Sequence, residues 1–566
     1  MKKQDVVRVF AIASVAAAGS MLAVQSGMAA AGGVGANADA IGSMGPVPKA
    51  QGSPGDHTES GLQGSTTPEE RMSGDSTKDY NCNLELVGKY QGEGAYSQDG
   101  PTFYGDCAYY GTDNVTSLQQ HHGVTVVDVS DPRHPQATAF LNDSPAMLRP
   151  HETLKANAAR GILVAGEFNG PGFAVYDISQ DCRHPILKSS IVLQGSAGHE
   201  GNFAPDGKTY YLTQNNRGLG GFLYPVDLTD PANAKGLPPW QFVPSPDNPT
   251  GDGRSHENWL NFDGFMPGLT EGTRLYAGQP GEFGNTGSSI GPDGLVIEDV
   301  SDYQFRRPNP KIRIISKLFW TDQGQAEEML PITIKGHPYI VSSDEAGGAG
   351  GVGGWTAACA RGASAFGYPM IIDVADEKNP RIISKLMLEV NDPANCEVLR
   401  NQTPPDIPGT APGTNLPPDS GTTNYSGERC TPDRQRNTTM LACSYQNAQL
   451  RVFDVRDPYH PKEIAYWKSG AVGSRVQPGS GSWAQGGVRT VDKIAGYVRF
   501  YKRPPGQNAS GNGAHGNGDG NANGHGRGPE LEIWTVSDGN GLQVLRFSDG
   551  FKALHKDLLD EAGGDE

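Results

Sequence analysis

One strand–turn–strand unit recurs along this 566-residue chain and limits its fold more than any other feature. Each copy begins with an alternating run of β-branched and aromatic residues, continues with an aspartate-led turn that usually holds proline, and ends with a second short strand. A chain made of copies of one β unit grows as a single repeat body, so its length does not imply several domains. The six copies start at Gly123 (GVTVVDVSDPRHP), Gly172 (GFAVYDISQDCRHP), Gly221 (GFLYPVDLTDP), Gly294 (GLVIEDVSDYQF), Tyr368 (YPMIIDVADEKNP) and Leu450 (LRVFDVRDPYHP).

The turn of each copy holds an aspartate at one fixed place. Aspartate and serine bond local backbone amides and proline presets φ, so the two strands are predicted to fold back as a hairpin, with the aspartates in a structural role. The first two spacings, 49 and 50 residues, suit a four-stranded blade with two further strands before each hairpin. The larger later spacings predict insertions, at residues 401–438 and 506–528. The repeated aspartates are Asp128, Asp177, Asp227, Asp299, Asp373 and Asp454.

From about Asn81 to Phe547 these units resemble the repeats of the LVIVD family, and this resemblance implies a β-propeller. The strand from Gly541 (GLQVLRFSDG) matches the first strand of the hairpin, but no closing strand follows it, whereas the strand from Asn83 (NLELVGKYQG) precedes the first full blade. A propeller has to protect its open edges, so the early strand is expected to complete the last blade. We therefore predict an all-β, seven-bladed β-propeller over residues 80–550, with its last blade closed by an N-terminal strand.

The ends of the chain differ from this body in composition. Residues 1–30 have a basic start, an Ala-rich apolar run and small residues after it, which predicts a cleaved signal peptide, a secreted or periplasmic protein and no transmembrane segment after cleavage. Residues 31–79 have almost no large apolar side chain and are predicted to be a disordered spacer. Residues 551–566 are predicted to form an acidic tail that adds little to a core.

The charge and cysteine content narrow the partners and the compartment. A formal net charge of -17 argues against nucleic acid, which needs clustered Lys and Arg, and it is compatible with cationic ligands. Seven cysteines in an exported chain imply disulfides and, because the number is odd, one unpaired thiol. The pairing is left open.

A second pattern occurs where the innermost strand of each blade is expected to begin: a His–Glu pair in three consecutive blades, followed by related pairs in later blades. Innermost strands line the channel, so equal positions form a ring around the axis. Neighbouring strand residues point to opposite sides, so only one column faces the axis unless the strand entrance is irregular. The first column is His151, His199, His256, Glu327 and Cys396; the second is Glu152, Glu200, Glu257, Glu328 and Glu397.

The composition of this ring predicts a cation site. Imidazoles from neighbouring blades, completed by a carboxylate or thiolate, suit Zn, Cu, Fe or Mn, so the first column is predicted to supply metal ligands. Alternatively, the carboxylates of the second column are predicted to bind the cofactor, because packed carboxylates repel one another, which raises some pKa values or recruits a cation such as Ca²⁺. A structural alternative remains, in which the repeated pairs tie the blades together through hydrogen bonds.

Two functions follow from this ring. The first is a scaffold that binds an unidentified extracellular or envelope ligand or partner, with a divalent metal in its channel. The second is a metal-dependent enzyme, an oxidoreductase or a hydrolase or lyase, in which a remaining carboxylate acts as acid or base. The chain has no HExxH or paired CxxC motif, so the standard zinc-hydrolase and zinc-finger interpretations lack support.

Overall fold

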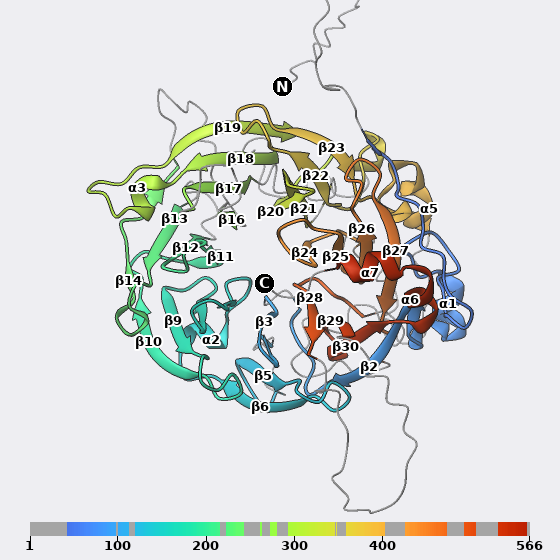
Figure 1. The fold of residues 1–566 in the computed structure, drawn as a ribbon, viewed down its shortest axis with the longest axis horizontal. Helices are drawn as coiled ribbons and strands as arrows, with labels where there is room; N and C mark the ends of the chain where they lie inside the picture. Colours follow the sequence, from blue (N-terminus) through green and yellow to red (C-terminus); the bar gives the residue numbers. More distant parts are fainter. Residues whose placement is uncertain are drawn as a thin grey trace, which may run out of the picture. The chain divides into compact units, whose positions relative to one another are not determined.

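Seven small antiparallel sheets surround a common axis in the computed structural model, which confirms the predicted seven-bladed β-propeller (Figure 1). The predicted signal peptide, the predicted insertion at 506–528 and most of the one at 401–438 lie outside the described residues. The structure describes residues 42–97, 100–112, 119–214, 222–242, 261–262, 272–279, 293–345, 347, 358–401, 425–472, 492–504 and 530–562.

In blades 1 to 4 the strands follow the chain order from the innermost strand outward. Blade 1 contains β3 (Thr102–Tyr104), β4 (Cys107–Tyr110), β5 (Val124–Asp128) and β6 (Gln136–Leu141). Blade 2 contains β7 (Lys155–Asn157), β8 (Ile162–Gly166), β9 (Gly172–Asp177) and β10 (Ile186–Val192). Blade 3 contains β11 (Gly198–Phe203), β12 (Thr209–Gln214), β13 (Phe222–Asp227), β14 (Lys235–Gly236) and β15 (Trp240–Gln241). Blade 4 contains β16 (Asn261–Phe262), β17 (Arg274–Gln279), β18 (Asp293–Asp299) and β19 (Arg313–Trp320).

The remaining blades include the two strands contributed by the N-terminal part of the chain. Blade 5 contains β20 (Ala326–Ile334), β21 (His337–Asp344), β22 (Met370–Asp373) and β23 (Arg381–Lys385). Blade 6 contains β24 (Arg429–Pro432), β25 (Met440–Ser444), β26 (Leu450–Asp454), β27 (Lys462–Lys468) and β1 (Tyr80–Cys82). Blade 7 contains β28 (Arg499–Arg503), β29 (Glu530–Ser537), β30 (Gly541–Phe547) and β2 (Leu84–Tyr90).

The ring closes as the sequence predicts. Strand β2 pairs antiparallel with β30, with Leu84 opposite Phe547, and so supplies the outermost strand of blade 7. The preceding strand β1 pairs with β27 and adds a fifth strand to blade 6, which the sequence pattern did not predict. The N-terminal part of the chain therefore covers the outer edges of two adjacent blades.

The repeated hairpins follow the turn chemistry expected of them. In each of the six copies the repeated aspartate accepts a hydrogen bond from the backbone N–H two residues later, as Asp128 does from Ser130 and Asp454 from Arg456. The histidines before proline in three of these turns pair with the aspartate three residues earlier, as His134 does with Asp131. These turns all lie at one end of the blades, which we call the turn end; the innermost strands begin at the opposite end, the channel end.

The apolar core lies between neighbouring blades. Blades 7 and 1 share a cluster that contains Trp534 and Tyr110, and blades 1 and 2 share one that contains Tyr109 and Tyr176. Corresponding clusters join every other adjacent pair of blades, including blades 5 and 6, where Ile371 meets buried residues of β25 and β26. Because each blade buries both of its faces, its strands read as alternating or continuous apolar runs.

Residues 42–79 differ from the predicted disordered spacer: they form an ordered segment, here called the N-terminal strap, that packs on blades 5 and 6. Val47 is buried and its N–H bonds to the carbonyl of Met387. Glu59 is fully buried against Arg451 and Lys468. The strap is held mainly by polar contacts of this kind, so its shortage of large apolar residues does not keep it disordered.

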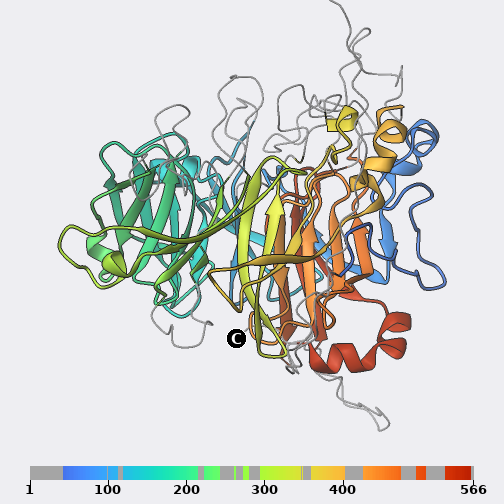
Figure 2. The ribbon, with the colours of Figure 1, turned by 90° about the horizontal axis from the view of Figure 1, so that it is seen from above.

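The acidic tail also differs from its prediction. Helices α6 (Asp549–Leu554) and α7 (Lys556–Glu561) lie at the turn end, opposite the face that carries α5 (Figure 2). Phe551 and Leu558 are buried in the core between blades 6 and 7, so the tail does contribute to a core. The short helices elsewhere are α1 (Pro68–Ser73), α2 (Pro145–Leu148), α3 (Ser301–Gln304) and α5 (Cys396–Asn401).

Six cysteines form three disulfides, and the Cys82 thiol is buried and unpaired, as the odd number implies. The bond between Cys107 and Cys182 joins blades 1 and 2. Among the described residues, no helix combines the length and the apolar character needed to span a membrane.

Candidate functional site at the channel end

The innermost strands of blades 2, 3, 5 and 6 bring acidic, imidazole and guanidinium side chains together at the channel end. One pair lies two residues before β7, one lies at the start of β11, one at the start of β20 and one at the start of β24. Pairwise ionic contacts connect side chains from all four blades. The residues are His151 and Glu152, His199 and Glu200, Glu327 and Glu328, and Glu428 and Arg429.

Irregular backbone at the strand entrances lets both members of a pair contribute to this cluster. The pairing of β11 with β12 shifts register between Gly198 and Gly201, which places an extra residue at the His–Glu pair of β11. The pairing of β20 with β21 shifts in the same way between Ala326 and Met329, across the Glu–Glu pair. β-bulges re-aim side chains in this manner. In blade 2 His151 has a φ of +45°, a left-handed conformation uncommon for a residue with a Cβ.

His151, Glu152 and His199 form the most compact part of the cluster. The Nε2 atom of His151 lies 3.6 Å from Oε2 of Glu152, and Nε2 of His199 lies 3.4 Å from the same oxygen. The ligand atoms of the three residues lie within 4.8 Å of one another, a spacing that a metal ion can bridge. Glu152 and His199 are buried, and the His151 side chain is 11% exposed, so the triad opens to solvent on the His151 side.

Arg429 lies on the other side of Glu152. Its Nη2 is 2.8 Å from Oε1 of Glu152 and 3.4 Å from Oε1 of Glu200, and its Nη1 pairs with Glu327. The two oxygens of Glu152 therefore have different neighbours, the guanidinium on one side and the two imidazoles on the other. Arg429 fixes Glu152 in place without occupying the oxygen that faces the histidines.

Burial and charge set the protonation of the triad. Burial by itself would raise the pKa of Glu152, but the charges of His151 and Arg429 and the bond to His199 hold it well below its usual value, so Glu152 is an anion. Burial lowers the pKa of His199, which favours the neutral imidazole that binds metal ions. Both groups are therefore in the protonation state that a metal ligand needs.

The remaining buried carboxyls outnumber the cationic side chains around them. Burial raises the pKa of Glu328 to about 8 and that of Glu428 to about 8, and it raises the pKa of Glu200 well above its usual value. Oε2 of Glu200 has no hydrogen-bond partner among the described residues. Burial also lowers the pKa of Lys155 to about 8; its Nζ lies 4.8 Å from the ring centre of Tyr497. This excess of buried acid makes the cluster favourable for added positive charge.

The structure brings most of the predicted ring residues together and moves two of them elsewhere. His256 and Glu257 lie outside the described residues. Cys396 and Glu397 were predicted to start the innermost strand of blade 6, but they lie in α5, where Cys396 is disulfide-bonded to Cys359 and Glu397 is exposed. A disulfide sulfur is not a thiolate ligand, so Cys396 does not belong to the ring. The others, His151, Glu152, His199, Glu200, Glu327 and Glu328, all lie at the channel end.

Sequence reasoning missed the true entrance of blade 6. The predicted insertion extends to residue 438 and therefore includes β24, together with Glu428 and Arg429. The segment Gly427–Glu428–Arg429 does resemble the Gly–His–Glu start of β11, which was the available signal. Phe168 carried no signal of its own: its ring packs against His151, with ring centres 4.1 Å apart, only because the chain crosses between two blades there.

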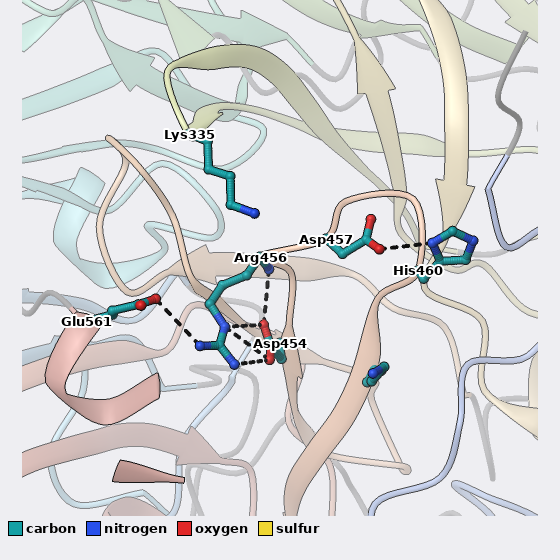
Figure 3. Close-up of a pocket in the computed structure, with 7 residues that line it drawn as sticks. Lys335, Asp454, Arg456, Asp457, His460 and Glu561 are labelled. Carbon is teal, nitrogen blue, oxygen red and sulfur yellow. Dashed lines mark hydrogen bonds and ion pairs between the residues drawn. The ribbon is translucent and has the colours of Figure 1, made fainter. Parts of the chain in front are cut away.

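A second cluster of charged residues lines a cavity of about 360 Å³ at the turn end of blades 5 and 6 (Figure 3). Here the charges are already paired with one another: Arg456 contacts Asp454 and also Asp557 and Glu561 of α7. Lys335 points into the cavity from the turn between β20 and β21. These side chains are far more exposed than those of the channel end, so their charges are screened by water.

Comparison with known proteins does not extend this description to a function. No family model and no curated protein sequence matches the chain. The solved structures that resemble it include a periplasmic gluconolactonase from Pseudomonas aeruginosa, with 13% identity, 77% of this chain and 98% of that chain covered, and a TM-score of 0.40. Sqt1 of Saccharomyces cerevisiae has 9% identity, coverage of 81% and 98%, and a TM-score of 0.42. A hypothetical selenium-binding protein from Sulfolobus tokodaii has 11% identity, coverage of 80% and 94%, and a TM-score of 0.40. Likenesses this distant carry no argument about activity.

Proposed function

We propose that this chain is a secreted or periplasmic propeller of the LVIVD type that serves as a ligand-binding scaffold and holds a divalent transition-metal ion at its channel end. The metal ligands are His151, Glu152 and His199. The observation that supports this most directly is the position of one carboxylate oxygen, Oε2 of Glu152, beside the Nε2 atoms of both histidines.

The spacing of these atoms suits a small ion. In a tetrahedral site with metal–ligand bonds of about 2.0–2.1 Å, neighbouring ligand atoms lie about 3.3 Å apart. The contacts of 3.4 and 3.6 Å from Glu152 to the histidines are close to that separation. Small side-chain movements then complete the site, and three protein ligands leave a fourth position open.

The donor set also narrows the choice of metal. Two imidazoles and one carboxylate suit Zn²⁺, Cu²⁺, Fe²⁺ or Mn²⁺, whereas Ca²⁺ prefers six to eight oxygen ligands. Glu152 supplies one negative charge for a divalent ion, and the neighbouring buried carboxyls release protons when the ion binds. Arg429 holds Glu152 as an outer support of the site. Binding should weaken at low pH, because the histidines and Glu152 must be deprotonated to coordinate the ion.

Elemental analysis and calorimetric Zn²⁺ titration of the purified mature chain test this proposal. The double variant His151→Ala with His199→Ala is expected to lose the bound metal. The matched control is His134→Ala with His184→Ala, which removes two exposed histidines from the turn end and should leave metal content unchanged. Equal metal content in the two double variants, or no metal in the parent chain, overturns the proposal. A loss of stability without any metal binding would instead support hydrogen bonds between blades as the role of the ring.

A further inference from the structure

The solvent side of the triad carries a further arrangement, formed by Arg149 and Phe168. Phe168 packs on both histidines, with its ring centre 4.1 Å from that of His151 and 5.3 Å from that of His199. The guanidinium carbon of Arg149 lies 5.4 Å from the centre of the same ring. One aromatic ring therefore contacts both proposed metal ligands and a cation.

The backbone fixes this ring in place. The N–H of Phe168 bonds to the carbonyl of Arg149 at 2.8 Å, and the N–H of Asn169 bonds to the carbonyl of Gly198 at 2.8 Å. Phe168 also forms a parallel β-bridge with Gly198, which is the residue immediately before His199. The ring is therefore held between blades 2 and 3, in register with both histidines, and does not depend on a mobile loop for its position.

Arg149 differs from the other arginine of this site. Arg429 is buried and pairs with carboxylates, whereas Arg149 is exposed and forms no ion pair with the described residues. A guanidinium stacked on a ring keeps the N–H groups at its edge available, and these N–H groups match a carboxylate in geometry.

We infer that the metal site takes a small carboxylate ligand with a flat apolar body, whose carboxylate occupies the open metal position and bonds to Arg149 while its body lies against Phe168. This inference rests on the proposed metal site. His151 is the most exposed of the three ligands and packs on Phe168, and Arg149 lies over the same ring, so both residues adjoin the exposed part of the triad. Tyr96 adds a second aromatic ring near His151, with ring centres 6.1 Å apart.

The charge around the site sets the order in which the metal and the carboxylate ligand bind. Without metal, the Glu152 carboxylate at the triad repels an anion, so the carboxylate ligand binds after the cation. The carboxylate ligand in turn tightens metal binding, because the effect of one ligand on the affinity for another is thermodynamically reciprocal.

The test uses Co²⁺ as the metal and benzoate as the probe, with the full mature chain. Co²⁺ binding is first measured without benzoate from its visible absorption; benzoate is then added at full Co²⁺ occupancy. We expect benzoate to change the Co²⁺ spectrum saturably and to tighten Co²⁺ binding, and uncharged benzamide to do neither.

Variants assign the contacts. Arg149→Gln should weaken benzoate binding at least tenfold, because it removes a charge-assisted hydrogen bond, and Arg149→Lys should weaken it less, because the positive charge remains. Phe168→Leu should reduce the preference for benzoate over acetate. The matched control is Arg133→Gln, which removes an exposed arginine from the turn end and should leave benzoate binding unchanged.

The outcomes separate the two proposals. If Co²⁺ does not bind to the triad, the proposed function fails and the carboxylate site fails with it. If Co²⁺ binds and benzoate leaves its spectrum unchanged, only the carboxylate inference fails. Equal benzoate affinity in the parent chain and Arg149→Gln, or equal binding with and without metal, also overturns the inference.

Discussion

Blade 6 contains two fully buried arginines, two strands apart, whose surroundings differ in charge balance. Arg451 on β26 pairs with Glu59 of the N-terminal strap and with Glu463, and Lys468 also contacts Glu59, so this group holds equal numbers of acids and bases. Arg429 on β24 faces three carboxylates from blades 2, 3 and 5, with more buried carboxyls behind them. The balanced group attaches a segment of chain, whereas the unbalanced one has room for another cation.

The largest expected effect is on the balanced group. Arg451→Met should lower the free energy of unfolding by about 3–5 kcal/mol, because it leaves Glu59 and Glu463 buried without their main counter-ion. Urea unfolding of the parent chain and the variant measures this, with Arg456→Met as a control at a partly exposed arginine. We call this group of Arg451, Lys468, Glu59 and Glu463 the strap group. A loss below about 1 kcal/mol would show that the strap group is not an integral part of the fold.

The same group should control stability in acid. Burial would raise the pKa of Glu59, but Arg451 and Lys468 lower it to about 2, below the ordinary value of 4.5. A carboxyl whose pKa is lower in the folded state stabilises the fold above pH 4.5, and this contribution is lost as the pH falls towards 2. The free energies of unfolding of the parent chain and Glu59→Gln should therefore differ most at neutral pH. The difference should shrink by on the order of 3 kcal/mol as the pH falls towards 2. Urea unfolding between pH 2.5 and 7 tests this; a constant difference would refute it.

The channel end should respond to metal where the strap group does not. Zn²⁺ at about one hundred times its dissociation constant should stabilise the parent chain by about 2.7 kcal/mol. The gain should disappear in the His151→Ala, His199→Ala double variant and persist in Glu59→Gln. Unfolding with and without Zn²⁺, with EDTA as the reversal, measures both. An equal gain in all three chains would place the metal elsewhere.

The smallest effect is expected at the turn end. Arg456→Ala removes ion pairs to Asp557 and Glu561 of α7, which are exposed and screened by water. The loss should be about 1 kcal/mol or less, and smaller still in 1 M salt. Leu558→Ala, which empties a buried position of the same helix, should cost about 2–5 kcal/mol. Similar losses for the two variants in thermal unfolding would mean that charge, not apolar packing, holds α7.

The parts of the fold that follow from local physics could be predicted from the sequence. The turn at Asp128 forms from residues that are adjacent in the chain, so the local sequence is enough to identify it. The closing role of β2 followed from counting strands and from the need to cover an edge. The strap was mispredicted, because the partners of Glu59 lie about four hundred residues away in the sequence.

The candidate site was predictable in its residue types but not in its assembly. The repeated His–Glu pairs indicated the channel end, but only the register shifts in β11 and β20 explain why neighbouring residues contribute together. Cys396 matched the spacing of the pattern and still lies outside the ring, because a disulfide holds it in α5. Arg429 was hidden inside a segment predicted to be an insertion.

By itself the sequence determined the repeat unit, the number of blades and the kinds of side chain at the strand entrances, because each depends on neighbouring residues or on simple periodicity. The tertiary structure decided which entrances meet, that Arg429 holds one oxygen of Glu152 and leaves the other to His151 and His199, and that Phe168 lies against both imidazoles. These contacts join different blades, and closure of the ring brings them within reach of one another.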